Sequence, residues 1–173
     1  MNAELRRNEI RKMLQNTDKP VSAGAFAAAF SVSRQIIVGD IALLRASGLD
    51  IQATPRGYCL PKTEKVPAVK HQIACRHSVQ DMQTELYTIV DEGCTVVDVI
   101  VEHPIYGQLT GMLSLSSRHD VDSFMDHCRK QDAQPLSLLT EGVHLHTILC
   151  PDEAAFERVK QKLGEKGLLL KDE

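Results

Sequence analysis

Two histidines separated by one residue lie in the string GVHLHT, residues 142–147. Alternate residues of a β-strand face the same side, about 6.5–7 Å apart, so His144 and His146 could chelate one transition-metal ion. The same pattern, met alone, also fits two polar side chains on the solvated face of a half-buried strand. The pair therefore indicates a metal site only if further ligands can reach it.

Two residues earlier in the chain could complete such a site. His77 precedes a helix predicted over about 79–91, and Glu85 lies inside that helix, on the side away from its apolar stripe. If residues 77–85 were all helical, their end Cα atoms would be about 12 Å apart, so the side chains can converge only if His77 lies in a turn. Three imidazoles and one carboxylate would form an N3O site, which suits Zn, Ni or Fe(II) and not Ca or Mg.

The first 60 residues carry side chains suited to reading DNA. Ser33 is placed to cap a predicted helix that Arg34 and Gln35 would open. The first residues of a recognition helix enter the major groove, where Arg can pair with guanine and Gln with adenine. Arg56, in a Pro-Arg-Gly turn between two short strands, would contact phosphate or the minor groove as a wing. The alternative is a winged helix that binds protein and whose charges are solvated.

Apolar spacing and breaking residues predict the elements that carry these side chains. In the first 60 residues they predict three helices and then two strands: 3–15, 22–30, 34–47, 49–54 and 58–60. Residues 61–70 contain two prolines and four charges, which predicts a linker. The remainder is predicted to run helix, two strands, helix, two strands, helix: 79–91, 96–103, 108–116, 119–129, 136–140, 143–150 and 152–165.

This order predicts an α+β fold made of two domains. Residues 1–60 would form a winged helix-turn-helix that binds DNA. Residues 71–173 would form an α/β sandwich, with an antiparallel sheet and helices on one face, that binds metal and ligand. A chain of 173 residues is long enough for two small domains, each with its own core.

Composition narrows the classes of function. Basic side chains outnumber acidic ones by eight to five in residues 1–60, whereas acidic ones outnumber basic ones by eighteen to twelve in the remainder, which favours modules with different partners. No apolar run approaches the roughly 20 residues of a membrane span, and the N-terminus lacks a signal-peptide core. The five cysteines are scattered without a Cys-x-x-Cys pair. These features predict a cytoplasmic protein that does not contact a membrane.

Two parts of the chain resemble known families. VSRQIIVGDIALLRASGLDIQATPRGYCL resembles the winged helix-turn-helix of the biotin-repressor type, although Gly39 stands where that type commonly carries a basic side chain. HSVQDMQTELYTIVDEG, DVIVEHPIYGQLTG and EGVHLHTI resemble the three-histidine domain that follows such a module in the niacin-responsive repressor (NiaR) family. The resemblance covers about residues 5–170.

The resemblance implies a transcriptional repressor that responds to nicotinic acid and controls genes for NAD synthesis or niacin uptake. It implies a homodimer on double-stranded operator DNA, with one divalent transition metal (Ni, Zn or Fe) held in each chain by the same three histidines and Glu85. Nicotinate, a pyridine with a carboxylate, could occupy an open metal position through either group. His103 or Tyr106, in the string HPIYG, would then hydrogen-bond its other end.

Two other functions stay open on the residues alone. In the first, a metal ion is itself the effector of a metal-responsive regulator. In the second, the open metal position activates water in a metalloenzyme domain tethered to DNA. An enzyme would need a general base within reach, but the sequence offers neither a second carboxylate–histidine pair near GVHLHT nor a glycine-rich phosphate loop. We therefore expect a regulator and not an enzyme.

Overall fold

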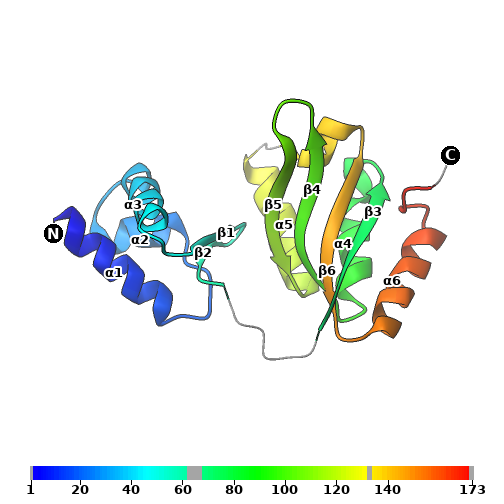
Figure 1. The fold of residues 1–173 in the computed structure, drawn as a ribbon, viewed down its shortest axis with the longest axis horizontal. Coiled ribbons are helices and arrows are strands. Elements are labelled where there is room, and N and C mark those ends of the chain that lie inside the picture. Colours follow the sequence, from blue (N-terminus) through cyan, green and yellow to red (C-terminus); the bar gives the residue numbers. More distant parts are fainter. Residues whose placement is uncertain (1, 62–67, 132–133, 172–173) are drawn as a thin grey trace. The chain divides into compact units, whose positions relative to one another are not determined.

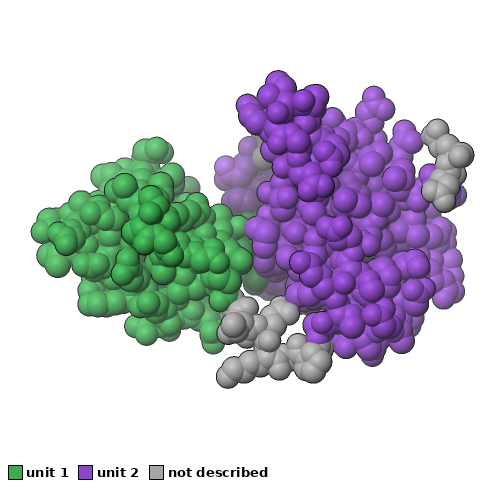
Figure 2. All heavy atoms as spheres, in the orientation of Figure 1, with its two compact units in different colours: residues 1–65 green, residues 66–173 purple. Residues whose placement is uncertain are grey.

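The chain folds into two compact units, residues 1–65 and 66–173 (Figures 1 and 2). The computed structural model describes residues 2–61, 68–131 and 134–171. Of the predicted linker, residues 62–67 lie outside the described part, while Val69 and Lys70 already belong to a strand. Each unit is described by itself.

The first unit contains three helices and a two-stranded hairpin: α1 (Ala3–Gln15), α2 (Ala23–Phe30), α3 (Arg34–Ala46), β1 (Gln52–Thr54) and β2 (Gly57–Cys59). At the start of each helix a side-chain oxygen accepts a hydrogen bond from a backbone N–H three residues on, and the three capping residues are Asn2, Ser22 and Ser33. Apolar side chains from all three helices share one core. The three predicted helices and the hairpin are confirmed, and β1 is shorter than predicted because Ile51 is buried in the helical core instead of extending the strand.

The apolar character of α2 and α3 comes from this core. No single helix in the described residues is long and apolar enough to cross a membrane. By length and composition α2 and α3 meet that criterion only together, as a pair bent by 106°. Phe26 of α2 and Ile37 of α3 are completely buried within the first unit.

Gly39 lies at an exposed position in the middle of α3. The Cβ that alanine would add there meets no neighbouring atom within 4 Å. Glycine inside a helix costs about 0.5–1 kcal/mol relative to alanine, so Gly39→Ala should raise the free energy of unfolding by about that amount in chemical denaturation. Gly48→Ala is the matched control: its surroundings are equally open, but its φ of +90° should make that variant less stable. A destabilised Gly39→Ala would contradict the prediction.

The second unit is a four-stranded antiparallel sheet with helices packed over one face (Figure 1). The strand order is β3-β6-β4-β5, so β6 lies inside the sheet. The elements in chain order are β3 (Val69–Arg76), the 3-10 helix η1 (Val79–Asp81), α4 (Met82–Val90), β4 (Thr95–His103), β5 (Gly107–Leu115), α5 (Arg118–Gln131), the 3-10 helix η2 (Leu136–Thr140), β6 (Val143–Cys150) and α6 (Glu153–Glu165). This architecture confirms the predicted α+β fold.

Two elements of the second unit differ from the prediction. The unit begins with a strand, β3, whose first half is partly exposed and carries polar residues, so it lacks the apolar alternation of a buried strand. The predicted strand over 136–140 is wrong: these residues form η2, in which Ser137 O accepts hydrogen bonds from Gly142 N–H and from the Thr140 hydroxyl. Because β3 pairs with β6 along its whole length, the sheet gains its fourth strand from a different part of the chain.

Candidate metal centre and DNA-recognition surface

The predicted ligands come together between the sheet and α4. His144 and His146 alternate along β6, and both are buried. Glu85 is completely buried on α4. His77 lies in the loop between β3 and η1, so it is outside the helix, which is the condition that the sequence set for its convergence with Glu85.

All three imidazoles direct their Nε2 atoms at the Glu85 carboxylate. The Nε2 atom of His77 is 2.7 Å from Glu85 Oε2, that of His144 is 3.1 Å from Oε1, and that of His146 is 3.3 Å from Oε2. No side chain of the four is more than 4% exposed. The three histidines and Glu85 therefore form one closed cluster, which we call the His3Glu cluster.

Backbone carbonyls fix the tautomer of each ring. The Nδ1 atoms of His77, His144 and His146 lie 2.8, 2.9 and 2.6 Å from the carbonyl oxygens of Ser78, Gly142 and Asp98. A carbonyl can only accept, so each Nδ1 must carry the hydrogen, and each neutral ring then presents a lone pair at Nε2. Three nitrogen lone pairs and a carboxylate thus face one point, which is the arrangement that a transition metal binds.

The electrostatics of the cluster also favour a cation. Burial alone would raise the pKa of Glu85, but the histidines around it outweigh burial and hold that pKa well below its ordinary value. Burial alone would lower the pKa of His77 and His146, but the Glu85 carboxylate raises both. A charge on His77 opposes a charge on His146, because two neighbouring imidazolium ions repel each other. The Nε2 atom of His77 stays buried without a hydrogen bond although it lies 2.7 Å from Glu85 Oε2. The donor set fits a single divalent ion.

Gly142 allows the loops of the centre to approach each other. Its φ is +88°, and a Cβ at this position would lie 2.4 Å from the carbonyl oxygen of His77. Its own carbonyl accepts from His144 Nδ1 and from the backbone N–H of His77. Sequence reasoning used the GVHLHT string only for its histidines and missed the role of its glycine.

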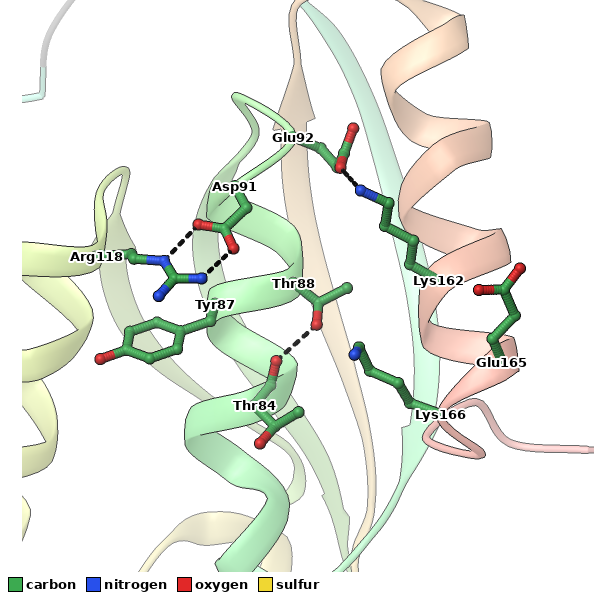
Figure 3. A pocket seen from close by; sticks show the side chains of 9 residues that line it. All are labelled: Thr84, Tyr87, Thr88, Asp91, Glu92, Arg118, Lys162, Glu165 and Lys166. Atoms are coloured by element: carbon green, nitrogen blue, oxygen red, sulfur yellow. Dashed lines mark hydrogen bonds and ion pairs between the residues drawn. The ribbon is translucent and has the colours of Figure 1, made fainter.

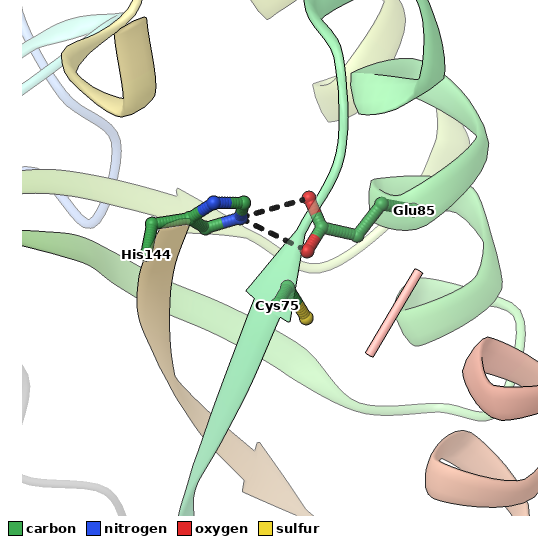
Figure 4. A group of neighbouring side chains, drawn as sticks. All are labelled: Cys75, Glu85 and His144. Carbon is green, nitrogen blue, oxygen red and sulfur yellow. Dashed lines mark hydrogen bonds and ion pairs between the residues drawn. The ribbon is translucent and has the colours of Figure 1, made fainter. Parts of the chain in front are cut away.

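Cys75 is the other residue of the centre that sequence reasoning missed. It lies on β3 directly opposite His144, and it is completely buried. Ligand atoms of Cys75, Glu85 and His144 all lie within 4.8 Å of one another (Figure 4). Burial and the nearby Glu85 carboxylate raise the pKa of the Cys75 thiol, so it is protonated in the absence of a metal. Its position two residues before His77 would have been the only local signal.

A cavity of about 640 Å³ opens beside the His3Glu cluster. Its lining includes Arg76 and His77 at the end of β3, and Glu141 and Gly142 before β6. Leu138 of η2 adds apolar surface. His77 is the member of the His3Glu cluster that lines this cavity. The cavity is large enough for a small aromatic acid.

A second cavity, of about 390 Å³, lies between α4 and α6 and includes the start of α5 (Figure 3). Arg118 pairs with Asp91 at 2.6 Å, and Lys162 forms an ion pair with Glu92. Its charges are therefore largely paired already, and none of its lining residues belongs to the His3Glu cluster.

The remaining histidines have other contacts. His103 ends β4, and its Nδ1 accepts hydrogen bonds from the backbone N–H groups of Ile105 and Tyr106, so it caps the β4–β5 turn. The Tyr106 side chain is 72% exposed. His71 pairs with Glu153, and the other two, His119 and His127, are exposed on α5. A ligand-binding role for His103 and Tyr106 stays a prediction.

The predicted DNA contacts lie at the start of α3 and in the hairpin. Ser33 caps α3 by accepting from Ile36 N–H at 3.3 Å, which leaves Arg34 and Gln35 as the exposed polar residues of the first turn. The Arg34 guanidinium lies against α2, where a Cβ on Gly24 would be 2.9 Å from its Nη2 atom. Arg56 is exposed at the turn between β1 and β2.

Two features of this surface were not predicted. Ile36 and Val38 of α3 are each 43% exposed beside Gln35, and apolar side chains at such positions can contact thymine methyl groups. Arg6 and Arg7 of α1 pair with Asp40, a buried residue of α3. These arginines therefore join α1 to α3.

Comparison with known proteins matches both units. A family model described as an HTH domain matches residues 6–59, and one described as a 3H domain matches residues 70–172. The chain is 41% identical over 167 residues to the probable transcription repressor NiaR of Thermotoga maritima, which covers 96% of this chain and 94% of that protein. It is also 41% identical over 172 residues to the transcription repressor NadR of Bacillus subtilis, with the same coverage.

Proposed function

The chain belongs to the NiaR/NadR family of transcription repressors, and from that premise we propose that nicotinic acid controls its binding to operator DNA. Its relatives are named as repressors, so it is a DNA-binding regulator and not an enzyme. The genes that we propose it represses are those of NAD synthesis or niacin uptake. It would act on the chromosome, in the cytoplasm.

We propose that the His3Glu cluster holds one divalent transition metal, Zn, Ni or Fe, in each chain. The observation that carries this proposal is the set of three Nε2 lone pairs that carbonyl-bound rings direct at one carboxylate. When bound, the metal would supply a Lewis-acid position that a pyridine nitrogen or a carboxylate can occupy. The protein's part is to orient its donors, and the backbone carbonyls do so by holding the hydrogen of each neutral ring at Nδ1.

The cavity beside His77 is where we place the nicotinate. Its ring would lie against the apolar surface of Leu138, and Arg76 at the rim is suited to pair with a carboxylate that does not bind the metal. His103 and Tyr106 of the β4–β5 turn are the alternative partners for that end of the ligand. Arg76→Ala and Tyr106→Phe distinguish the two, because only the residue that contacts the ligand should weaken nicotinate binding when it is changed.

Nicotinate would act by selecting one arrangement of a homodimer. A two-fold operator requires two winged helices whose half-sites are about one helical turn apart. A ligand shifts such an equilibrium only if it binds one arrangement more tightly than the other. We propose that the second unit forms the dimer, so that a change at its centre alters the spacing of the two recognition helices.

One calorimetric titration tests the effector. Metal-loaded protein should bind nicotinic acid and should bind nicotinamide, which lacks the carboxylate charge, more weakly. Metal-free protein should lose this binding. A gel shift on a DNA site selected from a random pool, with the metal concentration constant and nicotinate varied, should show a nicotinate-dependent change in affinity. If DNA binding follows the metal and ignores nicotinate, the protein is a metal-responsive regulator, the function that the buried donor set favours second.

Arg34 and Arg56 should contribute differently to DNA binding. Arg34→Ala should weaken binding to the selected site by about 1–3 kcal/mol and relax discrimination at one base pair, because a bidentate contact to guanine is lost. Arg56→Ala should weaken binding to all sequences alike and make its salt dependence shallower, as expected for a phosphate contact. Fluorescence anisotropy with selected and scrambled DNA measures both. Equal, sequence-independent losses would contradict the assignment of α3 as the recognition helix.

A further inference from the structure

We propose that Cys75 supplies a thiolate ligand to the metal of the His3Glu cluster and thereby makes the centre selective for zinc-like ions. This inference rests on the metal centre of the proposed function and adds a sulfur donor to its three nitrogens and one oxygen. The centre would bind a borderline divalent ion such as Zn²⁺ or Co²⁺ in preference to Mn²⁺ or Mg²⁺.

The register of the sheet places Cys75 at the centre. Residues directly opposite each other on antiparallel strands project from the same face, and Cys75 on β3 is opposite His144 on β6. The sulfur lies within 4.8 Å of ligand atoms of both His144 and Glu85 (Figure 4). A second observation points to the same place: His77 Nε2 is buried, has no hydrogen bond and is directed at the Glu85 carboxylate.

The other buried cysteines of the described residues, Cys94 and Cys150, provide a comparison with Cys75. Cys94 and Cys150 lie at the far end of β6 from His144, and their sulfur atoms contact each other at 2.9 Å, away from any histidine of the cluster. The Cys75 sulfur instead lies within 4.8 Å of a ligand atom of Glu85 and of His144. Packing alone does not require a metal-binding atom at this position, because a small apolar side chain would fill it.

Charge balance supplies a physical reason for a second anionic ligand. A divalent ion with three neutral imidazoles and one carboxylate would leave one net positive charge in a site whose side chains are at most 4% exposed. An uncompensated buried charge is strongly unfavourable. Loss of the thiol proton to solvent, with formation of a metal–sulfur bond, makes the centre neutral and involves no oxidation or reduction.

Cobalt substitution tests the sulfur ligand directly. The full-length, metal-free, reduced protein is titrated with Co²⁺ and followed by absorption. Wild-type protein should show the visible ligand-field bands of bound Co²⁺ and also a near-ultraviolet thiolate-to-cobalt charge-transfer band. Cys75→Ser should keep the visible bands and lose the near-ultraviolet band. Cys128→Ser, on α5 and outside the cluster, is the control and should keep both.

Competition between metals gives the second readout. The preference for Zn²⁺ over Mn²⁺ should fall about tenfold or more in Cys75→Ser and in Cys75→Ala, because a soft ligand is lost, and should be unchanged in Cys128→Ser. Thermal unfolding of the metal-free variants checks that they fold.

The outcomes separate this inference from the proposed function. Visible bands in wild-type protein without a charge-transfer band, or a charge-transfer band that persists in Cys75→Ser, would overturn the thiolate ligand and leave the His3Glu centre intact. No bound Co²⁺ and no bound Zn²⁺ at all would overturn both.

Discussion

Replacing His146 with alanine should leave the protein almost free of metal after dialysis. The imidazole is completely enclosed, its Nδ1 is fixed by Asp98 O at 2.6 Å, and it lies on an inner strand with hydrogen-bonded neighbours on both sides. Such a ligand has little freedom to lose on binding. Loss of a mere supporting contact costs about 10–100-fold in metal affinity, so loss of a ligand should cost at least the upper end of that range.

The measurement is metal content and metal affinity of His146→Ala, His144→Ala and His119→Ala. His119 is exposed on α5, so its variant should bind metal like the wild type. Normal metal content in both strand variants would refute the centre. Metal loss with unchanged nicotinate affinity would make the metal structural and would direct the search for the effector site to His103 and Tyr106.

Gly142→Ala should strongly lower the affinity for metal although it removes no ligand. Alanine at a φ of +88° is strained by about 1–3 kcal/mol, and its Cβ would lie 2.4 Å from the carbonyl oxygen of His77. That neighbour is backbone and cannot rotate away, so the His77 loop must move and its ring must leave the cluster. We expect metal affinity to fall about as far as in a ligand variant, together with a lower melting temperature.

A matched glycine separates the clash from the backbone strain. Gly167 has a φ of +70° but meets nothing within 4 Å of an added Cβ. Gly167→Ala should therefore lose some stability and keep its metal. Isothermal titration with Zn²⁺ and thermal unfolding of both variants provide the measurements. Equal metal affinity in Gly142→Ala and Gly167→Ala would show that the close approach of the two loops is not needed for binding.

The elements of the first unit could be predicted because their signals are local. Ser22 and Ser33 cap the helices that follow them, and Gly48, with its φ of +90°, lies just past the end of α3 as a stop signal predicts. What local reasoning could not show is the partner of an exposed-looking charge. Arg6 and Arg7 are distant from Asp40 in the sequence, and only the packing of α1 against α3 brings these charges together.

The same difference between local signals and long-range contacts applies to the metal centre. His144 and His146 share a strand face, and that relation is visible in two residues of sequence. The places of His77 and Glu85 were conditional on a turn, which the loop between β3 and η1 provides. Cys75 could not be predicted, because its proximity to His144 depends on the pairing of β3 with β6, and β3 itself lacks a strand-like pattern in its exposed half.

Strand β3 is held unequally at its two ends. Its last residues are hydrogen-bonded on both sides, to β6 and to the C-terminal segment, through Arg76 N–H to Leu168 O and Leu170 N–H to Ala74 O. Its first residues, next to the segment that leads from the DNA-binding unit, pair with β6 alone. Each residue that detached from β6 at that end would add up to about 3.5 Å to the connection with the DNA-binding unit. In the proposed homodimer, such detachment would lengthen the connection between the two units of each chain, and metal binding by His77, next to the other end of β3, would limit how many residues detach.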